Sequence, residues 1–149
     1  MYRSKNAFSM IELVFVIVVL GILAAIAVPK FSATRTDAQI AKGRSDVAAI
    51  RSAIVSERQT RIMKGDSNWI NSLSSSSTTL FDGNGTAPLL MYGVTAGSSD
   101  GDWSTSGSFP FTSYTFKVGG SDCDFTYDDD DGKFTLDNGQ DAICSKLVN

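Results

Sequence analysis

The stretch AFSMIELVFVIVVLGILAAIAVP, residues 7–29, decides the fold of this chain. Residues 8–28 carry one charged side chain, Glu12, and as a helix they would extend about 31 Å, close to the thickness of the hydrocarbon layer of a bilayer. Arg3 and Lys5 precede the apolar run, so the amino terminus is expected to stay in the cytoplasm and the carboxyl terminus to lie outside. The sequence therefore predicts a membrane-spanning helix near the start of the chain.

Three interpretations of this segment compete. A secretory signal peptide is supported by Ala25-Ile26-Ala27, an A-x-A cleavage site, and a plain signal anchor is the second possibility. Neither explains Glu12, because a charged side chain at the centre of a membrane costs about 2.5–3.5 kcal/mol. In the third interpretation the chain is cut after Ala7, and the new α-amine of Phe8 on a neighbouring chain supplies a cation for Glu12.

The same residues resemble the prepilin-type amino terminus of type IV pilins and type II secretion pseudopilins. The matching features are a short basic leader, Phe8 as the first mature residue, Glu12 as the fifth, and the later Gly21 and Pro29. The resemblance covers about 22 residues in spacing and type. One departure concerns Ala7, because the family normally has glycine before the cleavage point.

The resemblance implies a structural subunit and no enzyme. A membrane aspartyl peptidase would cut between Ala7 and Phe8, and the same enzyme would methylate the Phe8 amine. The precursor would wait in the bacterial inner membrane until an assembly platform moved it into a homo-oligomeric helical filament in the periplasm or at the cell surface. There Glu12 would pair with the Phe8 amine of the next subunit, and the helix between Gly21 and Pro29 would stretch.

Residues 30–64 predict an amphipathic continuation of the helix. The apolar stripe that we expect to pack on the downstream domain repeats every three or four residues and consists of Ile40, Gly43, Val47, Ile50 and Ile54. Ala33, Ala41 and Ala48 are expected to broaden this stripe, and Gly65 is a suitable end of the helix.

The net charge of the chain changes sign after residue 64, where this helix is expected to end. Residues 30–64 carry a net charge of +5, whereas residues 65–149 carry −9. The basic face of the helix is either solvated or paired with the acidic domain of the same or a neighbouring subunit. The acidic domain would repel nucleic acid and anionic membrane surfaces, so no direct nucleic-acid binding is expected.

Residues 65–149 predict a polar β domain. Alternating apolar residues indicate strands at 114–118, 123–127 and 134–136, with a weaker candidate at 89–92. Ser/Gly/Thr-rich residues 72–86 and 96–108 are expected to be surface loops. Three or four antiparallel strands over the long helix give an α+β fold, which matches the pilin architecture.

Cys123 and Cys144 are expected to form a structural disulfide. An exported domain lies in an oxidising environment, the two residues are too far apart for a C-x-x-C motif, and the chain has no histidine to complete a zinc site. The missing histidine also excludes Ser-His-Asp and Cys-His catalysis. Closing a loop of this size is worth about 3 kcal/mol.

Two further motifs give weak candidates. The four carboxylates of Asp128, Asp129, Asp130 and Asp131 are suited to calcium, but their spacing does not fit an EF-hand loop, and a solvated acidic turn is the simpler interpretation. Asn84 begins an N-x-T glycosylation acceptor. No cofactor is expected apart from this calcium candidate.

These observations divide the chain into a leader (1–7), a transmembrane or filament-core helix (8–29), its amphipathic continuation (30–64) and a periplasmic or extracellular β domain (65–149). The predicted function is that of a type IV pilus-like filament subunit. The alternatives are a type II secretion pseudopilin and a monomeric binding protein anchored in the inner membrane.

Overall fold

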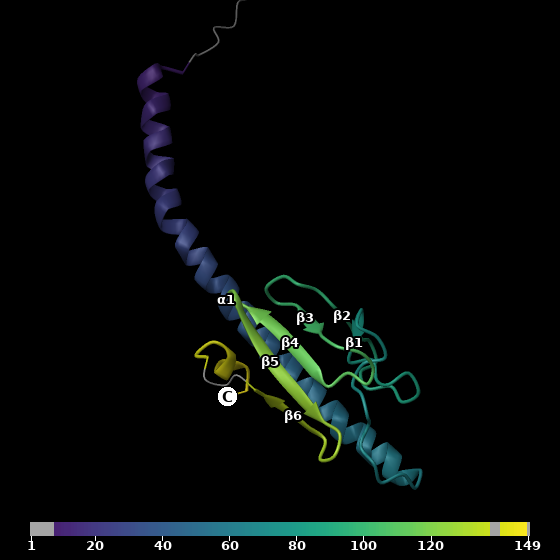
Figure 1. Ribbon diagram of the computed structural model, residues 1–149. Coiled ribbons are helices and arrows are strands. Elements are labelled where there is room, and N and C mark those ends of the chain that lie inside the picture. The colour runs from purple at the N-terminus through teal and green to yellow at the C-terminus, as the bar shows by residue number, and fades with distance from the viewer. Residues whose placement is uncertain (1–7, 138–140, 149) are drawn as a thin grey trace, which may run out of the picture. The chain divides into compact units, whose positions relative to one another are not determined.

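The computed structural model describes residues 8–137 and 141–148, and the chain divides into two units, the first ending at Arg35 and the second beginning at Thr36. The long helix α1 extends over Met10–Met63 (Figure 1). The strands are β1 (Thr79–Leu80), β2 (Val94–Thr95), β3 (Trp103–Thr105), β4 (Ser113–Val118), β5 (Ser121–Asp128) and β6 (Lys133–Leu136), followed by the 3₁₀ helix η1 (Cys144–Leu147). The fold is α+β, consistent with a pilin-like arrangement.

The second unit contains a four-stranded antiparallel sheet in the order β3-β4-β5-β6, while β1 and β2 form a separate pair. The sheet lies over the part of α1 that belongs to this unit (Figure 1). Side chains of β4 and β5 alternate between buried and accessible positions, as expected for strands with one covered face. The predicted strands at 114–118, 123–127 and 134–136 are thereby confirmed.

The apolar stripe of α1 forms one side of the core. All five predicted positions are buried: Ile40, Gly43, Val47, Ile50 and Ile54. They pack in one cluster with aromatic side chains of the sheet, in which Trp103 meets Phe116 at 4.9 Å between ring centroids. Ala41 and Ala48 do not broaden the stripe, because both are exposed on the outer side of the helix.

The carboxyl-terminal end of α1 matches the sequence prediction. Gly65 has a φ of 86°, a conformation that strains residues with a Cβ. Its N–H donates to the carbonyl of Ile62 at 3.0 Å, and the next N–H, of Asp66, donates to that of Arg61 at 3.0 Å. This pair of bonds is the Schellman arrangement, which satisfies carbonyls at the end of the helix.

Two arginines of α1 donate to carbonyl groups of β6 and η1 rather than to carboxylates. Arg51 donates from Nε and Nη2 to the carbonyl of Phe134 in β6, at 3.0 and 2.9 Å. Arg44 makes the same forked contact with the carbonyl of Lys146 in η1, at 3.0 and 2.7 Å. Hydrogen bonds from charged donors contribute about 1.5–3 kcal/mol each when sheltered from water, less when exposed. At these two positions the basic face is neither simply solvated nor paired with carboxylates. Arg61 does pair with the acidic domain, because its Nη1 lies 3.0 Å from Oδ2 of Asp66.

The Ser/Gly/Thr-rich segments contribute to the core, contrary to the prediction that they are surface loops. Residues 72–86 contain β1 and bury Leu73, Leu80 and Phe81. Residues 96–108 contain β3, whose Trp103 is fully buried and donates from Nε1 to a carboxylate oxygen of Asp46 at 3.0 Å. The weak strand candidate at 89–92 was wrong, because these residues form bends.

Replacement of Gly43 tests the contact between α1 and the sheet. A Cβ there would lie 2.5 Å from Cε1 of Phe116 and 2.8 Å from Cδ2 of Leu147, both buried. We expect Gly43→Val to lower the free energy of unfolding by about 1–3 kcal/mol, because overpacking forces neighbours apart.

Thermal and urea unfolding of the purified chain measure this effect. Ala48→Val places the same side chain on the exposed face of the same helix and is expected to change stability little. Equal stabilities of the two variants would contradict the close packing at Gly43.

Candidate functional site

The amino-terminal end of α1 is defined by Ser9. Its Oγ accepts a hydrogen bond from the N–H of Glu12 at 3.2 Å, and its carbonyl accepts from the N–H of Leu13 at 3.2 Å. Phe8 and Ser9 precede the helix, which begins at Met10. Ser9 is therefore the N-cap, and Glu12 occupies the third helical position, where a carboxylate also favours the helix dipole.

Residues 10–28 of α1 expose apolar side chains on every side of the helix. The candidate membrane span is Met10–Val28, with a mean hydropathy of 3.0 and no part of it buried by the described residues. Four consecutive residues, Leu13 to Val16, are all at least 44 % exposed, and successive residues point about 100° apart around a helix. A helix that is apolar all round requires burial in a membrane or among other chains.

The carboxylate of Glu12 has no ion-pair partner among residues 8–137 and 141–148. It is exposed, as is Phe8, whose side chain is 78 % exposed. The first unit thus exposes one carboxylate, that of Glu12, in the first turn of an otherwise apolar helical segment.

Gly21 and Pro29 both lie within α1. A Cβ added at Gly21 would meet no atom of the described residues within 4 Å, so their packing does not require a glycine there. The helix continues through Pro29, which has no N–H to donate to the carbonyl of Ala25. Ala7, the other predicted cleavage residue, lies outside the described residues.

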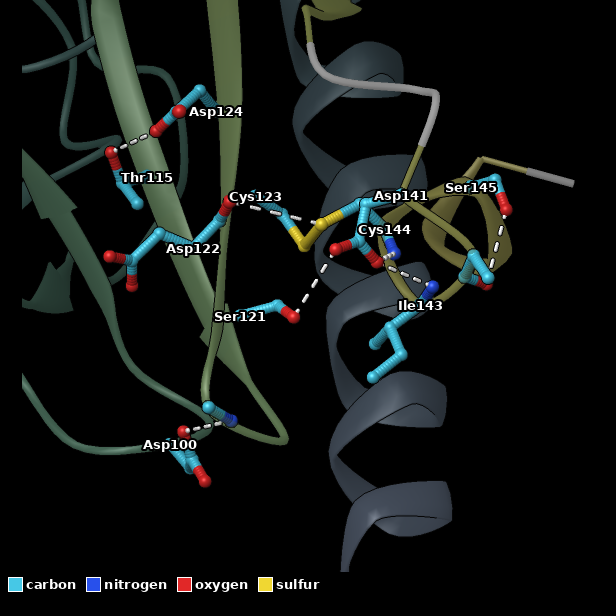
Figure 2. Close-up of a disulfide and its surroundings, with 12 residues drawn as sticks. Asp100, Thr115, Ser121, Asp122, Cys123, Asp124, Asp141, Ile143, Cys144 and Ser145 are labelled. Carbon is cyan, nitrogen blue, oxygen red and sulfur yellow. Dashed lines mark hydrogen bonds between the residues drawn. A yellow bond between two sulfur atoms is a disulfide. The ribbon is translucent and has the colours of Figure 1, made fainter.

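The two cysteines form a disulfide that joins β5 to η1 near the end of the chain (Figure 2). The Cα atoms of Cys123 and Cys144 are 5.3 Å apart, and both residues are fully buried. Asp141 organises the turn into η1, because its Oδ1 accepts from the N–H groups of Ile143 and Cys144 at 2.7 and 3.3 Å (Figure 2). These two backbone donors, Ile143 first, hold the pKa of Asp141 below its ordinary value.

The acidic turn between β5 and β6 is shaped by local hydrogen bonds. Asp128 accepts from the N–H of Asp130 at 2.9 Å, and Asp131 accepts from the N–H of Lys133 at 3.0 Å and pairs with its ammonium group. The Lys133 side chain is the largest cause that lowers the pKa of Asp131. Within the described residues, no three acidic or cysteine side chains are grouped closely enough to hold a metal ion.

Asn84 takes part in a turn rather than extending freely into solvent. Its Oδ1 accepts from the N–H groups of Thr86 and Ala87 at 3.1 and 2.9 Å, and its Nδ2 donates to Asn71 at 2.8 Å. A glycan on Nδ2 would replace one of the two amide hydrogens beside Asn71.

The cap made by Ser9 was not predicted, although the sequence carries its signal. A serine followed three residues later by glutamate, directly before an apolar run, is the pattern of a capping box. The three-residue spacing of Ser9 and Glu12 therefore predicts the cap. The charge of Glu12 by itself does not predict it.

A family model described as the prokaryotic N-terminal methylation motif matches residues 2–28. This is the prepilin-type motif of type IV pilins and pseudopilins, and it covers the leader and the apolar segment. The match supports a pilin-like or pseudopilin precursor, anchored in a membrane and structural rather than enzymatic. Neither curated proteins nor solved structures give a match to this chain.

Removal of the disulfide tests its part in stability. We expect Cys123→Ser with Cys144→Ser to lower the free energy of unfolding by about 2–5 kcal/mol, because the unfolded chain regains the freedom of the open loop. Urea unfolding of the purified double variant measures the change. Ser145→Ala, beside the bond but outside it, serves as the control, and equal stability of the double variant and the control would contradict a structural role.

Proposed function

We propose that this chain is the structural subunit of a type IV pilus-like filament, polymerised through its amino-terminal helix. The observation that carries the proposal is the exposed apolar segment Met10–Val28 with Glu12 in its first turn, inside a methylation motif. A segment that is apolar on every side has two stable environments, the bilayer before assembly and a bundle of identical helices afterwards.

Processing creates the group that Glu12 needs. A prepilin peptidase cuts between Ala7 and Phe8, which removes the basic leader of residues 1–7, and then methylates the new amine. The methylated amine remains a base and is protonated at neutral pH. Each mature subunit therefore carries one cation at Phe8 and one anion at Glu12, at the same end of the helix.

Pairing between subunits removes both charges from hydrocarbon together. A lone charge at the membrane centre costs about 2.5–3.5 kcal/mol, so an incoming Phe8 amine next to an established Glu12 relieves two costs with one contact. The geometry of the pair also sets how far one helix is displaced along the next. Glu12 is exposed and without an ion-pair partner among the described residues, so it is accessible to a second chain.

Gly21 and Pro29 give the segment between them a weaker helix. Glycine lowers helix propensity by about 1 kcal/mol relative to alanine, and proline leaves the carbonyl of Ala25 without its helical donor. Among residues 8–137 and 141–148 no contact explains Gly21, because a Cβ there would meet no atom within 4 Å. We assign this segment to stretching during extraction from the membrane into the filament.

The rest of the chain is assigned to positions outside the membrane-spanning segment. Residues 30–64 continue the helix, and residues 65–149 form the domain on the periplasmic or outer side, where the disulfide persists. The assembly platform in the inner membrane and the peptidase are the partners before polymerisation, and other copies of the chain are the partners in the filament.

Mechanical shearing of cells separates this function from its alternatives. Abundant subunit in sheared surface fibres is the expected result. A subunit that forms cross-linked multimers but stays with the envelope would indicate a secretion pseudopilin instead. A subunit that does not cross-link to itself would indicate an anchored binding protein and contradict the filament.

Substitution of Glu12 tests the pairing. Glu12→Gln removes the charge but keeps a side chain that serves in a capping box, whereas Glu12→Val removes both. We expect both variants to accumulate normally in the membrane, because insertion becomes easier, and to lose at least nine tenths of the sheared filaments, as measured by immunoblot.

Two results would contradict this mechanism. Wild-type filament yields from Glu12→Val would show that the carboxylate is unnecessary. Normal assembly of Glu12→Gln with failure of Glu12→Val would show that Glu12 acts through the helix end rather than through charge.

A further inference from the structure

The segment between β1 and β2 exposes two large apolar side chains from a backbone that is held in place. Met91 and Tyr92 are 88 % and 83 % exposed. The N–H of Leu90 donates to the carbonyl of Phe81 at 3.0 Å, and Leu90 packs against the core. On the other side, the pairing of β2 with β1 begins at Val94. A partner that binds these two side chains therefore does not have to order the loop first.

A groove lies between α1 and β6 in the same unit. It encloses about 350 Å³, its walls are mostly apolar, and it is lined by Arg51, Val55, Gly132, Lys133, Phe134 and Thr135. The side chain of Val55 is 50 % exposed. Hollows of about 300–1,000 Å³ commonly hold small molecules, so aromatic and methionine side chains are of a suitable size for this groove.

The charges around the groove favour an occupant from the polar domain of this same sequence. Arg51 has two of its N–H donors on the carbonyl of Phe134 and forms no ion pair with a carboxylate of residues 8–137 and 141–148. A guanidinium fixed in this way can lie against the face of a tyrosine ring. Residues 65–116, which include Tyr92, contain four aspartates and no lysine or arginine, a net charge of −4.

The loop and the groove belong to different edges of the fold. The groove borders β6, one edge of the four-stranded sheet, whereas the β1–β2 pair lies next to β3, the other edge (Figure 1). The exposure of Met91 and Tyr92 shows that they do not fill the groove of their own chain. A contact between two different surfaces of identical chains leaves one of each free at the ends, so it repeats as a ring or as a helical filament.

We propose that Met91 and Tyr92 of one subunit dock into the α1–β6 groove of a second copy of this chain, with the Tyr92 ring against Arg51. The proposal rests on the proposed function, because the filament brings many copies of the second unit together. The contact joins second units and is separate from the pairing of Phe8 with Glu12. It buries exposed apolar surface on both subunits, which favours association.

Photochemical cross-linking in cells that produce the full-length chain tests which surface the loop meets. Tyr92 is replaced by p-benzoylphenylalanine, the cells are illuminated, and covalent dimers from the sheared filaments are digested and analysed by mass spectrometry. We expect attachment to residues 51–55 or 132–135 of another copy. The same replacement at Phe109, an aromatic side chain that is also exposed, is the matched control and is expected not to attach there.

Substitutions on both sides of the contact supply a second measurement. We expect Met91→Ser with Tyr92→Ser to lower the yield of sheared filaments at least fivefold and to leave the unfolding temperature of the purified chain unchanged, because both side chains are exposed. Val55→Lys places a charge in the groove and is expected to lower the cross-link from position 92 at least fivefold. Ala49→Lys, exposed about 120° away around α1, is expected to leave it unchanged.

Three results would overturn the proposal. Attachment from position 92 to a different protein, or to another surface of a second copy, would show that the loop docks elsewhere. Absence of covalent dimers in filaments of normal yield would remove this contact but leave the filament. A wild-type chain that forms no filaments and does not cross-link to itself would overturn the proposed function as well.

Discussion

One helix, α1, carries two segments with different solvent requirements, and this constraint governs the rest of the chain. Its first segment, Met10–Val28, is apolar on every side and buries nothing against the described residues. The segment from Ile40 to Ile54 is apolar on one side only and covers the sheet of the second unit. A single element therefore supplies both the candidate membrane span and one side of the core of the second unit.

The second unit is stabilised by the contacts that its strands and η1 make with its own part of α1. Gly43 lets Phe116 and η1 approach the helix closely, and Arg51 and Arg44 hold the outer edges, β6 and the carboxyl-terminal turn, through carbonyl groups. The disulfide fixes η1 to β5. These contacts leave the opposite face of the helix, with Ala41 and Ala48, exposed in the isolated chain.

The features that depend on local pattern could be predicted from the sequence, and those that depend on distant contacts could not. A repeat of three and four identified the buried stripe, and alternation identified β4, β5 and β6. Phe81 and Trp103 were missed because their segments are rich in serine, threonine, glycine and aspartate and contain few apolar residues, so no periodicity marks them. Their burial depends on partners far along the chain, such as Asp46 for Trp103, and on the buried Oγ of Ser74, which accepts from the N–H of Phe81. The motif located the candidate site, whereas the cap within it is marked only by the three-residue spacing of Ser9 and Glu12.

The intact mass of the chain recovered from the cell envelope tests the central claim most directly. The account predicts a chain that begins at Phe8 and carries one added methyl group, with a side-chain net charge of −5 after loss of Arg3 and Lys5. A chain that begins at Val28 would contradict it, because cleavage after Ala25-Ile26-Ala27 would have removed the segment through which the subunits are proposed to assemble.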